Sequence, residues 1–258
     1  MSINNQKQMW EKSWQSQNYI SPEETLYSRF TKKAYRTLKR FIDKEDLLIL
    51  EARCGTGRLC CLLAENFSKA EITGIDFTPG SLEIANKLKQ YLDVKNVEFK
   101  EGDLFKLDYP DEYFDVVFNS GVLEHFPLDK ANNYNDALRE MIRVLKPGGK
   151  IIIDVPNWYC FAHTLYKRAL KKAGKEYVYG YEKSFKHLEL IELFKAHGLV
   201  DLKLSAYDSA HGIYRLRGYS LLLKWLGDIV YLIDNPLLES LFGFMLLIKG
   251  EKPFKKDK

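Results

Sequence analysis

The sequence predicts an α/β fold in which a mainly parallel sheet is covered by helices on both faces. Short apolar runs, typical of strands buried on two sides, alternate with segments that have helical periodicity. Turn residues separate the two kinds of segment, as at residues 146–149, where Lys-Pro-Gly-Gly predicts a turn after a helix. Neither an internal repeat nor a change of composition marks a second domain.

Seven strands are expected, and the helices between them are amphipathic. The strands are predicted at residues 47–52, 71–76, 97–103, 114–119, 150–156, 199–207 and 242–250. The clearest helix has apolar residues at helical spacing from Tyr134 to Leu145. Thr78 and Pro79 suit the start of another helix, and Gly198 suits the end of a helix over about 185–197.

Composition excludes several classes of protein. The 258 residues are 46% hydrophobic and 29% charged, which is ordinary for a globular chain and argues against disorder. A net charge of +4 does not by itself imply a nucleic-acid partner, and none is expected. The four cysteines form no Cys-x-x-Cys pair, which argues against a disulfide framework or a metal site and favours a cytoplasmic location. The first residues lack a signal peptide's apolar stretch.

Polar residues stand where four of the predicted strands end. Glu51 and the glycines of Cys-Gly-Thr-Gly (54–57) follow the first strand, Asp76 ends the second, and Asp103 and Asn119 end the third and fourth. In an open α/β sheet, ligands bind outside the carboxyl ends of the strands. Glycines there permit close approach of the backbone to a ligand, and an acid at the second strand end can accept bonds from ribose hydroxyls. The spacing therefore predicts a site for a nucleoside-containing cofactor.

At these positions the chain resembles the class I S-adenosylmethionine-dependent methyltransferases. The resemblance runs from about Leu47 to Val155 and rests on ILEARCGTG, TGIDFTPGSLEIA, EGDLFKL, FDVVFNSGVLEHF and RVLKPGGKIIIDVPN. It implies a Rossmann-like, doubly wound sheet of seven strands whose last strand is antiparallel. It also implies S-adenosyl-L-methionine as cofactor and methyl transfer to a small-molecule or lipid-like acceptor.

The resemblance assigns roles to individual residues. Those expected around the methionine end of the cofactor are Glu51, Gly55, Gly57 and Asn119. Those expected around the ribose (the first) and the adenine (the others) are Asp76, Phe77, Asp103 and Leu104. An N-terminal lid over residues 1–35 is expected to contribute Trp10, Trp14 and Tyr19.

Arg53 departs from the family pattern, which has glycine or another small residue at this place. Its guanidinium could turn away or pair with the cofactor carboxylate and leave binding intact. It could instead obstruct the methionine end and repel the sulfonium, or the residue could be an introduced change. A harmless surface arginine is the plainest alternative. Impaired binding would make the chain a cofactor-binding pseudoenzyme with the methyltransferase fold but little turnover.

His125 is the candidate catalytic residue. Methyl transfer releases a neutral thioether, so most of the work is alignment and exclusion of water, and a base is needed only if the acceptor must lose a proton. His125 follows the fourth strand, and an ordinary histidine pKa suits a base. The alternative is that Glu124 and His125 only organise the loop.

Two segments lie outside the cofactor-binding core, which is expected over 36–156 of a single domain spanning 1–258. Residues 157–186 mix aromatic and basic side chains and could cap the site and attract an anionic acceptor, or form a solvated basic face. Residues 209–241 form an apolar insertion between the last two strands. Within it, 211–241 could hold a lipophilic acceptor, contact a membrane surface, pack on the sheet or form a homodimer.

Other functions fit less well. A nucleotide-dependent dehydrogenase needs Gly-x-Gly-x-x-Gly, and the third glycine is missing after Gly55 and Gly57, where Cys60 stands. Methylation of RNA or protein lacks support, because no Asn-Pro-Pro-Tyr-type tetrapeptide follows the fourth strand and no RNA-binding module is visible.

Overall fold

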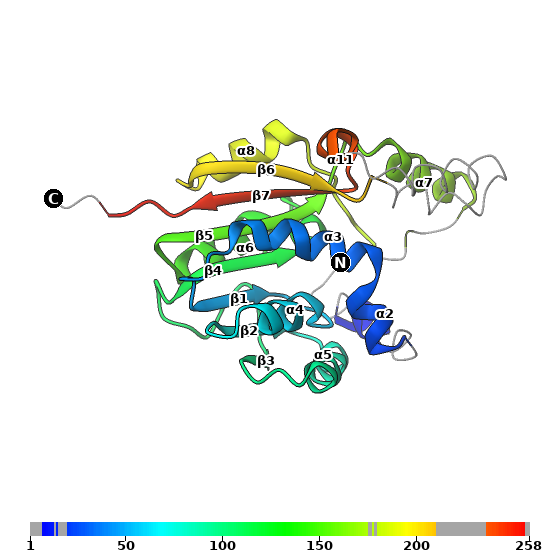
Figure 1. Ribbon diagram of the computed structural model, residues 1–258. Helices are drawn as coiled ribbons and strands as arrows, with labels where there is room; N and C mark the ends of the chain where they lie inside the picture. Colours follow the sequence, from blue (N-terminus) through cyan, green and yellow to red (C-terminus); the bar gives the residue numbers. More distant parts are fainter. Residues whose placement is uncertain are drawn as a thin grey trace.

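The protein is described by a computed structural model over residues 7–12, 14, 20–174, 177, 180–209 and 236–255. Its centre is a seven-stranded sheet in the order β3-β2-β1-β4-β5-β7-β6 with helices on both faces (Figure 1). The strands are β1 Leu48–Ala52, β2 Glu71–Asp76, β3 Val97–Glu101, β4 Phe114–Ser120, β5 Leu145–Pro156, β6 Val200–Tyr207 and β7 Met245–Glu251. Among the described strands, β7 alone runs opposite to the other six. The predicted fold class is confirmed.

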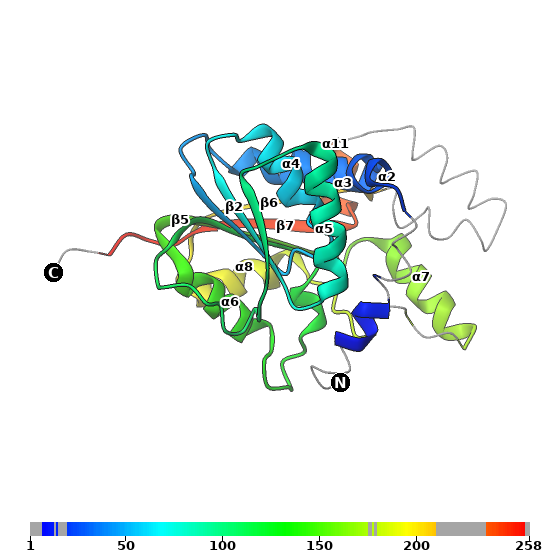
Figure 2. The same cartoon turned by 90° about the horizontal axis from the view of Figure 1, so that it is seen from below.

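The described helices cover this sheet, and most of them connect one strand to the next along the chain. They are α2 Pro22–Tyr27, α3 Arg29–Leu38, α4 Arg58–Asn66, α5 Pro79–Leu92, α6 Tyr134–Val144, α7 Phe161–Lys172, α8 His187–Ala196 and α11 Pro236–Phe242, with short 3-10 turns η1 Lys39–Phe41 and η2 Leu123–His125. Figures 1 and 2 show α7 projecting beyond the carboxyl ends of the parallel strands. Within the described part of the chain, no helix combines the length and apolarity needed to cross a membrane.

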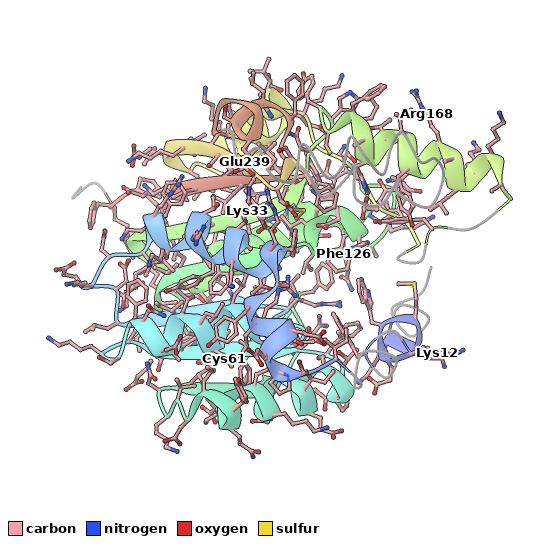
Figure 3. All side chains as sticks on the ribbon, turned by 45° about the vertical axis from the view of Figure 1, so that its right-hand side comes forward. Lys12, Lys33, Cys61, Phe126, Arg168 and Glu239 are labelled. Carbon is pink, nitrogen blue, oxygen red and sulfur yellow. The ribbon has the colours of Figure 1, made fainter. Side chains whose placement is uncertain are left out.

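Two apolar cores lie on opposite faces of the sheet. Ile49 of β1 packs in the core beneath α3, α4 and α5, whereas the next residue, Leu50, packs in the core shared with α6 and α8. Because successive side chains of a strand point to opposite faces, a strand covered on both sides needs an unbroken apolar run. Lys33 of α3 and Glu239 of α11 pair across the first face (Figure 3).

The segment 146–149 differs from its prediction. It does not form a free turn after α6 but belongs to β5, which begins at Leu145 directly after Val144. Leu145 pairs with Phe114 and Lys150 with Val116, so three extra residues bulge from β5 between these pairs. The glycine at 148 absorbs the bulge with φ +77°. Of the predicted apolar insertion, residues 210–235 lie outside the described part of the chain.

Candidate active site

A cavity of about 510 Å³ opens at the carboxyl ends of the strands. Its walls come from the turns that follow β1, β2, β4 and β5, together with α2, α3 and the short helix at residues 7–12. These four strands are parallel, so the turns that follow them converge on one edge of the sheet. The edge predicted to bind the cofactor is therefore hollow.

The loop after β1 is shaped by its two glycines. Gly57 has φ +66°, and a Cβ atom there would lie 2.5 Å from the ring of Phe99, so only glycine fits. Gly55 has φ +52°, and its N–H donates to Oδ2 of Asp76 at 2.9 Å. The other oxygen of Asp76 accepts from the Thr78 N–H at 2.9 Å and from the Thr78 hydroxyl. Asp76 thus fixes the loop and, since a carboxylate offers about four acceptor positions, keeps capacity for a ligand.

Glu51 lies in the floor of the cavity with Arg58 nearby. Burial raises the pKa of Glu51 to about 8, against the opposing effects of a hydrogen bond from the Cys60 thiol at 2.9 Å and of the Arg58 charge. Arg58, the first residue of α4, also lines the cavity, and its buried Nε has no hydrogen-bond partner among the described residues. The Glu51 carboxyl would gain from a cationic partner such as an amino group. The Arg58 guanidinium has an unused donor that suits a carboxylate, so the pair suits the two ends of an amino acid. Arg58 was not among the predicted site residues, although a cation directly after Gly57 is visible in the sequence.

Arg53 also lines the cavity and packs on aromatic rings. Its guanidinium carbon is 3.5 Å from the centre of the Phe77 ring and 5.2 Å from that of Phe126, and the residue is 9% exposed. Burial lowers the pKa of Arg53 to about 10, with Asp76 and Asp103 opposing, so the cation persists at neutral pH. Of the alternatives left open for Arg53, this position fits a guanidinium turned away from the loop, and its effect on the cofactor stays a prediction. Its backbone takes φ +68° and the side chain packs on Phe77, the residue that the resemblance places against adenine.

The structure brings together most of the predicted site residues. Those that line the cavity are Glu51, Arg53, Gly55, Asp76, Phe77, His125, Trp10 and Trp14. Four others do not line it: Gly57, Asp103, Leu104 and Asn119. Asp103 is exposed, Leu104 is buried in a core, and the amide of Asn119 donates to the Ala52 carbonyl. Tyr19 lies outside the described residues.

Two tryptophans of the N-terminal segment cover the cavity. Trp10 stacks on Trp14 with ring centres 5.6 Å apart and presents its ring edge-on to His125 at 5.3 Å. A Cβ atom at Gly55 would lie 3.3 Å from the Trp14 ring, so Trp14 contacts the glycine loop. Figure 3 shows the short helix that carries Lys12 standing outside the sheet, at the same edge as Phe126. The role of this segment as a lid stays a prediction.

His125 and Glu124, both in η2, also line the cavity. Nδ1 of His125 is 2.8 Å from the Tyr181 carbonyl, which can only accept, so Nδ1 carries the proton and Nε2 is the basic nitrogen. Burial lowers the pKa of His125, keeping the ring neutral. Burial, reinforced by the charge of Glu182, raises the pKa of Glu124, whose Oε2 has no partner among the described residues.

Glu182, an acid that acts on Glu124, is kept charged by its hydrogen-bond donors. It accepts hydrogen bonds from His163 Nε2 at 2.7 Å, Tyr177 at 2.8 Å and Lys167 at 3.3 Å. Burial opposes ionisation, but these donors lower the pKa of Glu182 to about 2. Apolar side chains also line the cavity, among them Phe244 and Met245, and Phe30, whose ring lies 5.6 Å from the Arg58 guanidinium. The compartment can hold a largely apolar molecule with one polar group.

Comparison with known proteins identifies the family of the chain. A family model described as a methyltransferase domain matches residues 43–197. A demethylmenaquinone methyltransferase of Listeria welshimeri is 28% identical over 153 residues, which cover 57% of this chain and 63% of that protein. The chain thus spans less than two thirds of the length of this relative.

Solved structures share the fold at low identity. A Thermotoga maritima protein, described as an S-adenosylmethionine-dependent methyltransferase and possible histamine N-methyltransferase, has a TM-score of 0.63 and 19% identity, covering 95% of this chain and 99% of its own. The phosphoethanolamine N-methyltransferase 2 of Haemonchus contortus, in complex with phosphomonomethylethanolamine and S-adenosylhomocysteine, has a TM-score of 0.65 and 16% identity, covering 96% and 60%. The resemblance and the cofactor expected from the strand ends are confirmed: the chain belongs to the methyltransferase-domain family and has the class I S-adenosylmethionine-dependent fold.

Proposed function

We propose that this chain transfers a methyl group from S-adenosylmethionine to a small, largely apolar acceptor. The observation that carries the proposal is one continuous cavity, which joins Glu51 and Asp76 at the strand ends to an apolar compartment beside His125. The cofactor supplies an electrophilic methyl on a sulfonium, and its leaving group is a neutral thioether. The protein's task is to bind, align and keep water out.

The residues present fit this cofactor. Glu51 would receive the amino group and Arg58 the carboxylate, because the first gains from a cationic partner and the second has an unused buried donor. Asp76 would receive a ribose hydroxyl at the acceptor position that its bonds to Gly55 and Thr78 leave open. Phe77 would lie against the adenine once Arg53 has left its ring.

Alignment and exclusion of water would come from the cavity walls. The stacked Trp10 and Trp14 would close one side, and burial of both reactants in one hollow fixes their distance and orientation. Such positioning supplies roughly 7–11 kcal/mol of a barrier when the geometry is good.

His125 would accept a proton if the acceptor has one to lose. The ring is neutral, and its bond to the Tyr181 carbonyl fixes the tautomer with Nε2 basic. The charge of Glu182, which opposes the lowering of the His125 pKa by burial, would stabilise the imidazolium once it forms. The alternative role, organising the loop alone, predicts no loss of chemistry when the ring is replaced by an amide.

A quinone-like acceptor fits the compartment. The relative described above is named for methylation of demethylmenaquinone, and the walls from Phe30, Phe244 and Met245 suit a flat apolar ring. The lipid-like part of such an acceptor would extend out of the cavity.

A labelling experiment tests the proposal. The protein is incubated with methyl-deuterated S-adenosylmethionine and reduced demethylmenaquinone with a short side chain, and the product is measured by mass. We expect one labelled methyl per product molecule. Phe244→Ala should raise KM for the acceptor but leave S-adenosylhomocysteine affinity unchanged, whereas Asp76→Asn should weaken the cofactor. Tight cofactor binding without transfer to quinols, catechols or amines would instead support a pseudoenzyme, and absent cofactor binding would contradict the whole assignment.

A further inference from the structure

Positive charge is concentrated in one segment of the chain. Residues 157–187 contain seven lysines and arginines and two glutamates, a net charge of +5, whereas the whole chain carries +4. The rest of the protein is therefore close to neutral. The concentration coincides with α7 and the turn before α8, at the edge where the cavity opens.

Helix α7 is two-sided. His163 and Leu170, seven residues apart, are buried against the body of the protein. On the opposite side, Phe161, Arg168 and Lys172 share one face and are exposed. These three span about 16 Å along the helix axis. Arg168 is labelled on this helix in Figure 3.

Large apolar side chains are exposed beside these cations. Trp158 is 52% exposed, Tyr159 46%, Phe161 67% and Leu188 72%. Two of them contact the residues that begin α8: the ring centres of Tyr159 and His187 are 5.1 Å apart, and Lys186 Nζ lies 5.5 Å from the centre of the Trp158 ring. We call these four apolar residues, with the cations Arg168, Lys171, Lys172 and Lys186, the α7 surface.

The cations of the α7 surface differ from their neighbours in pairing. Lys167 bonds Glu182 and Lys183 bonds Glu189, so these two are neutralised within the protein. Across the described residues, the four cations of the α7 surface have no acidic partner. Their charge is directed outward and is available to an anionic partner.

We propose that the α7 surface binds the anionic surface of a lipid bilayer. Tryptophan and tyrosine favour the headgroup level of a membrane, where their apolar rings and polar tips are both satisfied, and phenylalanine and leucine gain by entering the acyl boundary. Each cation near an anionic bilayer strengthens binding roughly fivefold. A nucleic acid would also attract the cations but would give Phe161 and Leu188 nothing to bury them.

This docking goes beyond methyl transfer, because it concerns where the protein works and not what it does. The last residue of β5, Pro156, lines the cavity, and Trp158 of the α7 surface follows it by two residues. Glu182 lines the cavity four residues before Lys186. A bilayer held on this surface therefore lies at the same edge of the sheet as the cavity.

Vesicle binding tests the proposal with a matched control. The whole chain is sedimented with vesicles of phosphatidylcholine alone and with added phosphatidylglycerol. We expect binding that requires phosphatidylglycerol and weakens with salt. Replacing Arg168, Lys171 and Lys172 by Gln should weaken it on the order of 100-fold. The control replaces Lys44, Lys69 and Lys95, exposed lysines at the amino ends of β1, β2 and β3, with the same loss of charge.

The outcomes separate the possibilities. The double variant Phe161→Ser, Leu188→Ser should release the protein from vesicles at a salt concentration that the unaltered chain withstands. Equal weakening by the two triple variants, or no preference for phosphatidylglycerol, would overturn the proposal. The proposal would also be overturned if the protein bound a DNA duplex through Arg168, Lys171 and Lys172 and did not bind vesicles. Calorimetry with S-adenosylhomocysteine on every variant reports separately on the cofactor site.

Discussion

Replacing Arg53 by glycine should tighten cofactor binding. In the free protein the guanidinium lies 3.5 Å from the centre of the Phe77 ring in a largely desolvated place. A cation–π contact of this kind is worth about 2 kcal/mol. An adenine that stacks on Phe77 must first displace the guanidinium and lose that contact. Without the side chain the loss disappears, and about 2 kcal/mol corresponds to roughly a 30-fold lower Kd.

The same substitution should change folding stability little. Glycine at φ +68° relieves a left-handed conformation that costs an L-residue about 1–2 kcal/mol. The lost contact with Phe77 offsets this gain to within about 1 kcal/mol. Thermal unfolding of Arg53→Gly should therefore resemble that of the unaltered chain, so a change in binding can be assigned to the site.

Titration calorimetry with S-adenosylhomocysteine measures the effect. Arg139→Ala, on the exposed side of α6, is the control for loss of an arginine and should bind as the unaltered chain does. If Arg53→Gly bound tenfold or more weakly, the guanidinium would itself be holding the cofactor, and the displacement argument would be refuted. If the unaltered chain bound nothing and Arg53→Gly bound well, the hypothesis that Arg53 impairs the site would be confirmed.

Three further outcomes follow from the site. Because the pKa of Glu51 is raised to about 8, cofactor binding that needs its ionised form should release a proton, and affinity should rise from pH 6 to 8 and then level off; Glu51→Gln should remove this slope. His125→Gln should lower kcat about 100-fold for an acceptor that loses a proton while leaving Kd for S-adenosylhomocysteine unchanged, and unchanged kcat would leave His125 a loop residue. Gly57→Ala should destabilise the fold by roughly 2–5 kcal/mol through the clash with Phe99 and the left-handed φ, and an unaltered melting temperature would contradict this.

The sequence predicted the sheet well because its strands are buried on both faces. Runs such as that around Ile49 and Leu50 must be apolar throughout, and such runs are visible without knowledge of the fold. Convergence of Glu51 and Asp76 also followed, since parallel strands bring their carboxyl ends to one edge. The bulge at 146–149 did not, because it depends on the register between β4 and β5.

The directions of the side chains in the site could not be predicted from the sequence. The sequence left open whether Arg53 turns away from the loop or meets the methionine end; its backbone conformation and the Phe77 ring, contributed by a different strand end, decide where the guanidinium goes. The contrast between Glu124 and Glu182 arises from donors on separate elements, His163 among them, that only folding brings near. Local spacing carries no signal for such encounters.

Asp76 performs two duties with one carboxylate. The oxygens that would face a ribose already hold the N–H of Gly55 and the Thr78 residue in place. A side chain with a single acceptor oxygen at this position would lose the bond to Gly55 or those to Thr78. The turn that shapes the pocket would then be less well fixed even without a bound nucleoside. Asp76 therefore has a structural and a binding role at once. A substitution that changed its contact with the ribose would also change the turn.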